Sequence, residues 1–278
     1  MTLPTKQICK RICQALVLHP IAWLLVGGTL FWMWGGLIPR IRWNAIEMMM
    51  AKNLLAGNGL IVAPLDPPAL WRPLLGALVC AFVELFTSSP RLVYQIVYAV
   101  SLTTFLIASF YAARALWDAA AGHAACLFIL TSGALTSRLI SHVHSISHVV
   151  FLLAAGPALW FTVLALREQT RRRLLAVGLL WGLAYLARWE ALLFFVIATG
   201  ILLCAMYAGK TDFRALRMGL FAVLGFAALF VPATTYEHWA KSRYGIWGPS
   251  AITTFYASQA WVTGNGDEDA GFADAQLK

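Results

Sequence analysis

The sequence predicts an all-α fold, a polytopic bundle of about seven transmembrane helices with juxtamembrane surface helices in the first outer loop. Hydrophobic residues make up 60% of its 278 residues and charged residues only 12%, which excludes an ordinary soluble domain. The apolar residues come in long continuous runs, as helices that cross about 30 Å of hydrocarbon require. These runs lack the two-residue alternation of transmembrane barrel strands.

Seven apolar runs are predicted to cross the membrane. They occupy residues 15–37, 92–113, 119–137, 146–166, 174–189, 191–208 and 218–236. The first run lacks a small-residue cleavage site, which favours a retained span over a signal peptide. An eighth stretch, about 69–87, begins among prolines. If it crossed, the basic cluster Arg167 to Arg173 would lie outside, against the positive-inside rule, so we place it on the outer surface.

The chain is predicted to form one membrane domain, residues 1–278. Its longest extramembrane stretch is the first outer loop, 39–91, and the outer C-terminal segment, 237–278, ends in a polar, acidic tail typical of a loop cut short. The distribution of basic residues places the N-terminus in the cytoplasm. We expect a multi-pass protein of a cell membrane, with its short loops favouring a bacterial inner membrane.

Two surface helices are predicted in the first outer loop. In the first, Trp43–Ala56, residues spaced three and four apart share one face; they are Asn44, Glu47, Met48, Ala51 and Leu55. The segment Gly57-Asn58-Gly59 predicts the end of that helix. Prolines then indicate an extended passage before the second helix, Ala69–Phe86.

The net charge of +9 reports topology first and gives no indication of nucleic-acid binding. Even so, the predicted outer face is rich in basic residues, which favours binding of an anion. The competing interpretation is that each cation reaches lipid headgroups from a span end. The residues in question are Arg40, Arg42, Lys52, Arg72, Arg91, Arg138, Arg188, Lys241 and Arg243.

Two outer carboxylates are candidate site residues. Glu47 lies on the predicted surface helix just after Arg40 and Arg42, and Glu190 follows Arg188 at a turn between two spans. An ionisable group at such a depth predicts a site. The alternatives are a solvated surface glutamate for Glu47 and a structural ion pair with Arg188 for Glu190.

Three of the six histidines fall in one short outer segment, at His142, His144 and His148. His144 and His148 are four residues apart, so a helix would place them on one face. Three interpretations stay open: ligands of a divalent metal, a catalytic or substrate contact, and structural hydrogen bonds. Because no carboxylate accompanies them, we assign no metal ligand. His238, after the last span, is expected on the same side.

Three motifs, in this order, resemble those of the membrane-embedded GT-C glycosyltransferases. Residues 51–59, AKNLLAGNG, are similar to the A-R/K-N-L-x-x-G-x-G helix of protein mannosyltransferases and lipid A aminoarabinose transferases. Pro67-Pro68 with Arg72-Pro73-Leu74 is similar to P-P-x-x-x-P-L. Residues 182–190, GLAYLARWE, are similar to G-L-A-x-L-x-R-P/x-E. The resemblance covers about residues 15–250, the seven-span part of such proteins.

The resemblance implies an inverting transferase that takes a sugar from a polyprenyl-phosphate donor at the outer side of the bilayer. The acceptor would be a lipid, a glycan or a protein. It implies Glu47 as the base, because the family's usual aspartate is replaced in the stretch around Arg42 and Asn44, and His144 as an auxiliary base or substrate contact. The donor phosphate would be held by basic outer residues, among them Arg40, Arg42, Arg138 and Arg188. Asn44, His142 and Glu190 complete the expected substrate contacts.

Two other functions are compatible with the sequence. A non-catalytic homologue that binds polyprenyl phosphate is favoured by the missing aspartate and by a chain that stops after the seven-span part. A small-molecule transporter is the third hypothesis, although inverted repeats are not evident. Charges lining the middle of the spans would favour transport, whereas charges gathered at the outer mouth would favour transfer. No cofactor is predicted, with a divalent metal left open.

Overall fold

The computed structural model describes residues 20–37, 46–61, 74–132, 146–209 and 214–244. Every regular element in these segments is an α-helix, in agreement with the predicted fold class. The helices are α2 (Ile21–Leu37), α3 (Ile46–Leu55), α4 (Leu74–Glu84), α5 (Pro90–Leu116), α6 (Ala119–Thr131), α8 (Ile146–Arg167), α9 (Arg171–Ala187), α10 (Ala191–Gly209) and α11 (Arg214–Tyr244).

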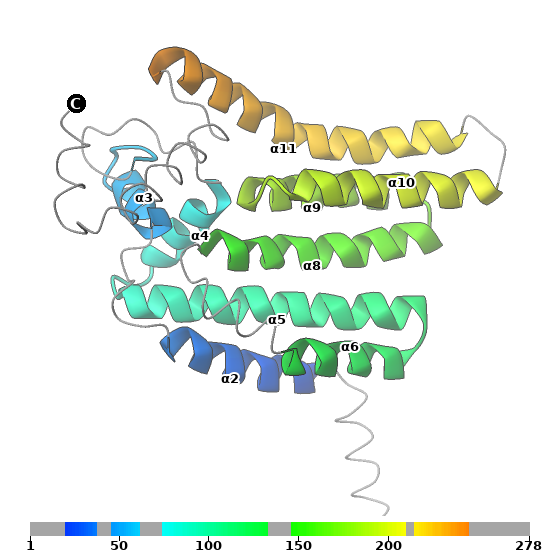
Figure 1. The fold of residues 1–278 in the computed structure, drawn as a ribbon, viewed down its shortest axis with the longest axis horizontal. Helices are drawn as coiled ribbons and strands as arrows, with labels where there is room; N and C mark the ends of the chain where they lie inside the picture. Colours follow the sequence, from blue (N-terminus) through cyan, green and yellow to red (C-terminus); the bar gives the residue numbers. More distant parts are fainter. Residues whose placement is uncertain (1–19, 38–45, 62–73, 133–145, 210–213, 245–278) are drawn as a thin grey trace, which may run out of the picture.

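Most of the helices run side by side along the long axis of the molecule, whereas α3 and α4 sit together at one end (Figure 1). We refer to this end as the α3–α4 end. The bundle helices are α2, α5, α6, α8, α9, α10 and α11, and each overlaps most of one of the seven apolar runs. Because consecutive bundle helices alternate in direction, the connections α8–α9 and α10–α11 lie at the opposite end and the turn α9–α10 lies at the α3–α4 end.

Two helices organise the packing. α5 contacts α2, α6 and α8, and α9 contacts α8, α10 and α11. Each is the centre of one cluster of buried apolar side chains, so the interior is divided between the two halves of the bundle. α4 touches α5, α8 and α9, and α3 packs mainly on α4. The two short helices therefore cover one end of both halves.

Three helical segments are long and apolar enough to cross a membrane: Pro90–Leu116, Ile146–Arg167 and Gly219–Trp239. Four shorter apolar segments lie in α2, α4, α6 and α10. Large apolar side chains are exposed on these helices, including Phe128 and Leu193. Such outward-facing apolar residues are typical of helices that contact lipid, which supports the prediction of a helical membrane protein.

Some predicted boundaries differ from the structure. α11 continues to Tyr244, so the C-terminal segment predicted to lie outside begins within a helix that contains Pro232. α4 spans Leu74–Glu84 and ends two residues before the predicted Phe86, and the beginning of its predicted range lies outside the described residues. On α3, Glu47, Met48 and Ala51 of the predicted face are buried, whereas Leu55 at the end of the helix is 45% exposed. The end of a helix has fewer neighbours to cover its side chains.

The glycines after α3 end it as predicted. Gly57 and Gly59 have φ angles of 81° and 85°, the left-handed region that favours glycine. The backbone N–H of Asn58 donates to the carbonyl of Asn53 at 2.9 Å, and that of Gly57 donates to Leu54. This pattern is the Schellman arrangement, which satisfies the last carbonyls of the helix and turns the chain back.

Candidate functional site

The structure describes three of the nine predicted site residues: Glu47, Arg188 and Glu190. All three lie at the α3–α4 end, Glu47 on α3 and the other two at the turn between α9 and α10. The remaining six lie outside the described residues; they are Arg40, Arg42, Asn44, Arg138, His142 and His144.

Glu47 is fully buried, although it lies in the first turn of a short helix. The hydroxyl of Ser147, in the first turn of α8, donates a hydrogen bond of 2.9 Å to its Oε1 atom. The alternative of a solvated surface glutamate is therefore wrong. A carboxylate taken out of water needs hydrogen bonds to offset its lost hydration, and Ser147 supplies one of them.

Gly76 provides the space in which this hydrogen bond forms. A Cβ atom placed on Gly76 would lie 2.9 Å from the Ser147 hydroxyl and 3.1 Å from Cγ of Glu47. Even the smallest side chain would thus press on both partners. The absence of a side chain on α4 lets α3 and α8 meet beside it, and this close approach joins three helices at one carboxylate.

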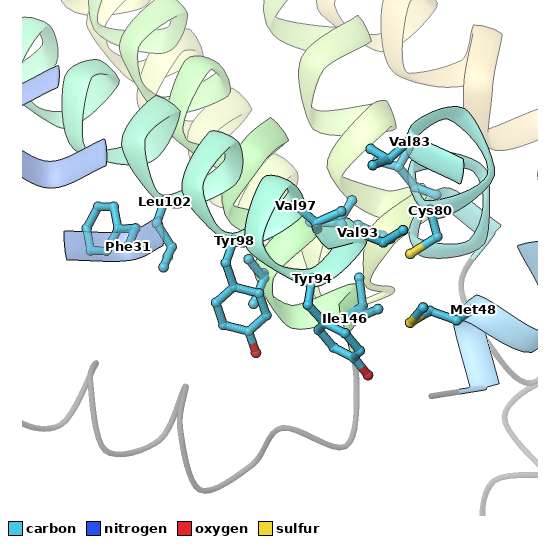
Figure 2. Close-up of a cluster of buried hydrophobic side chains, with 14 of the residues drawn as sticks. Phe31, Met48, Cys80, Val83, Val93, Tyr94, Val97, Tyr98, Leu102 and Ile146 are labelled. Carbon is cyan, nitrogen blue, oxygen red and sulfur yellow. The ribbon is translucent and has the colours of Figure 1, made fainter. Parts of the chain in front are cut away.

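The surroundings of Glu47 are largely apolar. Met48 of α3, Cys80 of α4, Tyr94 of α5 and Ile146 of α8 belong to one buried cluster (Figure 2). Burial raises the pKa of the Cys80 thiol well above its ordinary value, and the negative charge of Glu47 adds to the effect. Cys80 is therefore a neutral thiol, and it supplies neither a nucleophilic thiolate nor a charge beside Glu47.

Arg188 and Glu190 form an ion pair at the turn between α9 and α10. Nε of Arg188 donates to Oε2 of Glu190 at 3.1 Å, and Nη2 donates to Oε1. These hydrogen bonds hold the pKa of the Glu190 carboxyl below its ordinary value, against the opposing effect of partial burial. The pair is partly solvated, with 26% of the Arg188 side chain and 56% of the Glu190 side chain exposed.

His148 acts electrostatically on the ion pair. It follows Ser147 directly on α8, but its side chain is exposed, and its charge lowers the pKa of Glu190 further. Successive residues of a helix point about 100° apart. One turn of α8 thus presents Ser147 to Glu47 on one side and His148 towards Glu190 on another.

Two further groups near this turn were not among the predicted site residues. The side chain of Trp189 hydrogen-bonds Glu237 of α11, and His238 interacts electrostatically with the same carboxylate. Glu237 and His238 follow an apolar run at a span end, which was a usable sequence signal. That signal did not show that α11 continues as a helix to Tyr244, nor that it brings Glu237 and His238 near the α9–α10 turn.

Within the described segments, no group of three or more His, Cys, Asp or Glu side chains is arranged to hold a metal ion. The α3–α4 end instead has the buried carboxylate of Glu47, the partly solvated guanidinium of Arg188 and the exposed imidazole of His148. A carboxylate can accept a proton from a hydroxyl, and a guanidinium can hold a phosphate through paired hydrogen bonds.

Comparison of the chain with protein-family models, with curated proteins and with solved structures finds no match.

Proposed function

We propose that the chain is a glycosyltransferase that moves a sugar from a polyprenyl-phosphate donor to a lipid, glycan or protein acceptor at the α3–α4 end. The observation that carries this proposal is the buried Glu47 carboxylate, held by Ser147 where α3, α4 and α8 meet. Its helix also contains most of the first motif shared with GT-C glycosyltransferases, and Arg188 and Glu190 end the third.

The basic residues at the opposite end support an outer position for the site. Arg114 lies in the last turn of α5, Arg167 in the last turn of α8, and Arg171 to Arg173 begin α9. Arginine is enriched in short cytoplasmic loops, so this end is assigned to the cytoplasm. The α3–α4 end then faces outward, which in a bacterial inner membrane is the periplasmic side.

In the proposed reaction Glu47 takes the proton of the acceptor hydroxyl. The hydroxyl oxygen attacks the anomeric carbon, the bond from this carbon to the donor phosphate oxygen breaks, and polyprenyl phosphate leaves with inversion at the sugar. Arg188 stabilises the negative charge that builds up on the leaving phosphate. Arg40, Arg42 and Arg138 are proposed to share this role, with Asn44, His142 and His144 as substrate contacts.

Two contacts must open before this reaction. Glu47 is enclosed, so an acceptor reaches it only after α3 moves away from Ser147. Arg188 is paired with Glu190, so a phosphate must replace that carboxylate as its partner. Glu190 would then keep its electrostatic interaction with His148. Closure of a site around bound substrates is a common way of excluding water from a transfer reaction.

The placement of buried charge favours transfer over transport. Among the described residues, Glu47 is the one charged side chain that is fully buried, and it lies at the end of the bundle. Charges that serve transport commonly lie near the middle of the membrane. The buried polar side chains further along the bundle, Ser101 and Thr162, are neutral.

The test is Glu47→Gln in nanodiscs supplied with polyprenyl-phosphate sugars, following both donor binding and sugar loss. If Glu47 is the base, turnover falls by about 10²- to 10⁴-fold. Donor affinity should stay within about twofold of the wild-type value. Glutamine keeps the size of the side chain and its ability to accept from Ser147, so folding is preserved.

Ser147→Ala is the matched control. It removes the hydrogen bond but leaves the carboxylate, so it should lower stability by about 1–3 kcal/mol while turnover per folded molecule is largely retained. Equal loss of turnover in both variants, in step with lost stability, would assign Glu47 a structural role. Donor binding without turnover in the wild type would favour a lipid-presenting homologue, and neither binding nor turnover would favour transport.

A further inference from the structure

An apolar groove lies between α4, α5 and α8, on a side of α4 adjacent to the one that meets Glu47. Its volume is about 350 Å³. α4 contributes one wall, α5 the other, and α8 one residue at its base. The lining side chains are Leu78, Val79, Phe82, Val83, Ile96, Val97, Val100, Ser101 and Leu153.

The lining defines the chemical class of the occupant. None of these residues carries a charge, and Ser101, the polar one among them, is 1% exposed with its hydroxyl oxygen buried. A ligand with polar groups would lose hydration here without gaining hydrogen bonds. A hydrocarbon chain has no polar groups whose hydration could be lost, and it gains dispersion contacts with both walls.

Exposed apolar side chains line part of the groove. Leu78, Phe82 and Val100 on its rim are 42%, 62% and 51% exposed. α5, which forms one wall, is among the helices long and apolar enough to cross a membrane. Because α5 is a candidate span, a lipid chain that lies beside it in the bilayer can enter the groove sideways without passing through water.

We infer that the groove binds an acyl chain of a bilayer phospholipid. Phospholipid chains are the bulk component of the surrounding phase, so occupancy needs little selectivity over other lipids. An empty groove would leave both walls without contacts. The bound chain supports α4, whose adjacent positions Gly76 and Cys80 face the Glu47 cluster. This binding does not depend on glycosyl transfer.

The test is photocrosslinking of the full chain in phosphatidylcholine nanodiscs that contain a small fraction of phosphatidylcholine with a diazirine in one acyl chain. Adducts are located by mass spectrometry. We expect them to concentrate on the lining residues of α4 and α5. The comparison surface is on α10, where the exposed residues Leu193, Phe194, Val196 and Ile197 line no part of the groove. Equal adduct density on both surfaces would overturn the inference.

Val100→Trp and Val196→Trp form a matched pair, since these valines are 51% and 59% exposed and only Val100 lines the groove. Val100→Trp fills the space and should lower the groove adducts about tenfold; Val196→Trp should leave them unchanged. Unchanged adducts in Val100→Trp would contradict the inference. The inference would also be contradicted if adding a small fraction of polyprenyl phosphate removed the adducts from the wild-type protein. That result would assign the groove to the polyprenyl chain. The wild-type adduct map is decisive even if Val100→Trp does not fold.

Discussion

Glu47 is unusual because charged side chains are rarely fully buried, and those that are buried have partners that compensate for lost hydration. Its position in the first turn of α3 places it near the positive end of the helix dipole, which favours a carboxylate. Ser147 adds a hydrogen bond from another helix. A purely structural link of this kind is replaceable by apolar packing at little cost. Glu47 is the residue on which the proposed chemistry depends.

The ion pair at the α9–α10 turn predicts a narrow pH effect. The pKa of Glu190 is lowered from its ordinary value of 4.5, mainly by hydrogen bonds from Arg188. A lowered carboxyl pKa stabilises the folded state above pH 4.5, and this contribution is lost as the pH falls from 4.5 through the lower folded value. Because Glu190 is more than half exposed, we expect about 0–1 kcal/mol.

Thermal unfolding in detergent from pH 7 to pH 3 measures this contribution in the wild type and in Glu190→Gln. The two proteins should differ by a constant amount above pH 4.5 and converge below it. A difference that is unchanged throughout the range would show that Glu190 does not titrate with a lowered pKa.

The closest helix contact in the described residues joins α9 and α11, and glycines make it possible. Gly178 and Gly182 are four residues apart on α9, the spacing of membrane helices that pack backbone to backbone. A Cβ atom on Gly178 would lie 1.9 Å from the carbonyl oxygen of Ala222, and one on Gly225 would lie 2.3 Å from that of Leu175. Neither carbonyl can move aside without shifting its helix.

Gly178→Ala should therefore force α9 and α11 apart and lower stability by about 2–3 kcal/mol or more. Gly200→Ala on α10 is the control, because a Cβ atom there meets no atom within 4 Å. It should be neutral or stabilising by up to about 1 kcal/mol, since alanine favours helix more than glycine does. Both are measured by thermal unfolding in the same detergent. A similar effect of the two substitutions would contradict the close packing of α9 on α11.

The whole molecule separates its charges between its two ends. The arginines of the α8–α9 connection lie at one end, while Glu47, Arg188 and Glu190 lie at the other (Figure 1). Arg173 forms an ion pair with the exposed Glu168 and donates a hydrogen bond to the carbonyl of Leu164. Its side chain still remains 28% exposed. These arginines are the basis of the proposed orientation. The groups at the α3–α4 end include the buried acid Glu47.

Cysteine labelling in intact cells tests this orientation. Asn58→Cys at the α3–α4 end should react with a membrane-impermeant maleimide applied from outside, and Arg172→Cys should react only after permeabilisation. Both positions are exposed in the structure. The wild-type protein, which contains five cysteines, measures the background labelling: Cys80 and Cys126 are buried, whereas Cys204 is exposed. The reverse pattern would place the proposed site in the cytoplasm.

Composition and apolar run length were enough to predict the all-helical membrane fold and the approximate bounds of the bundle helices. These features follow from the number of apolar residues needed to cross hydrocarbon, which is a local property of the chain. The end of α3 at Gly57 was predictable for a similar reason, because a left-handed residue after a helix favours glycine wherever it occurs. The pairing of Arg188 with Glu190 was predictable from their separation of only two residues.

Tertiary structure alone decided what surrounds Glu47. The sequence separates Glu47 from Ser147 by 100 residues, and helical spacing gives no information about contacts over such a distance. The same holds for Gly76, which makes room for both, and for Glu237, which α11 brings to Trp189. A face predicted from spacing shows which side chains point together; whether they meet water, lipid or another helix depends on the packing of segments far apart in the chain.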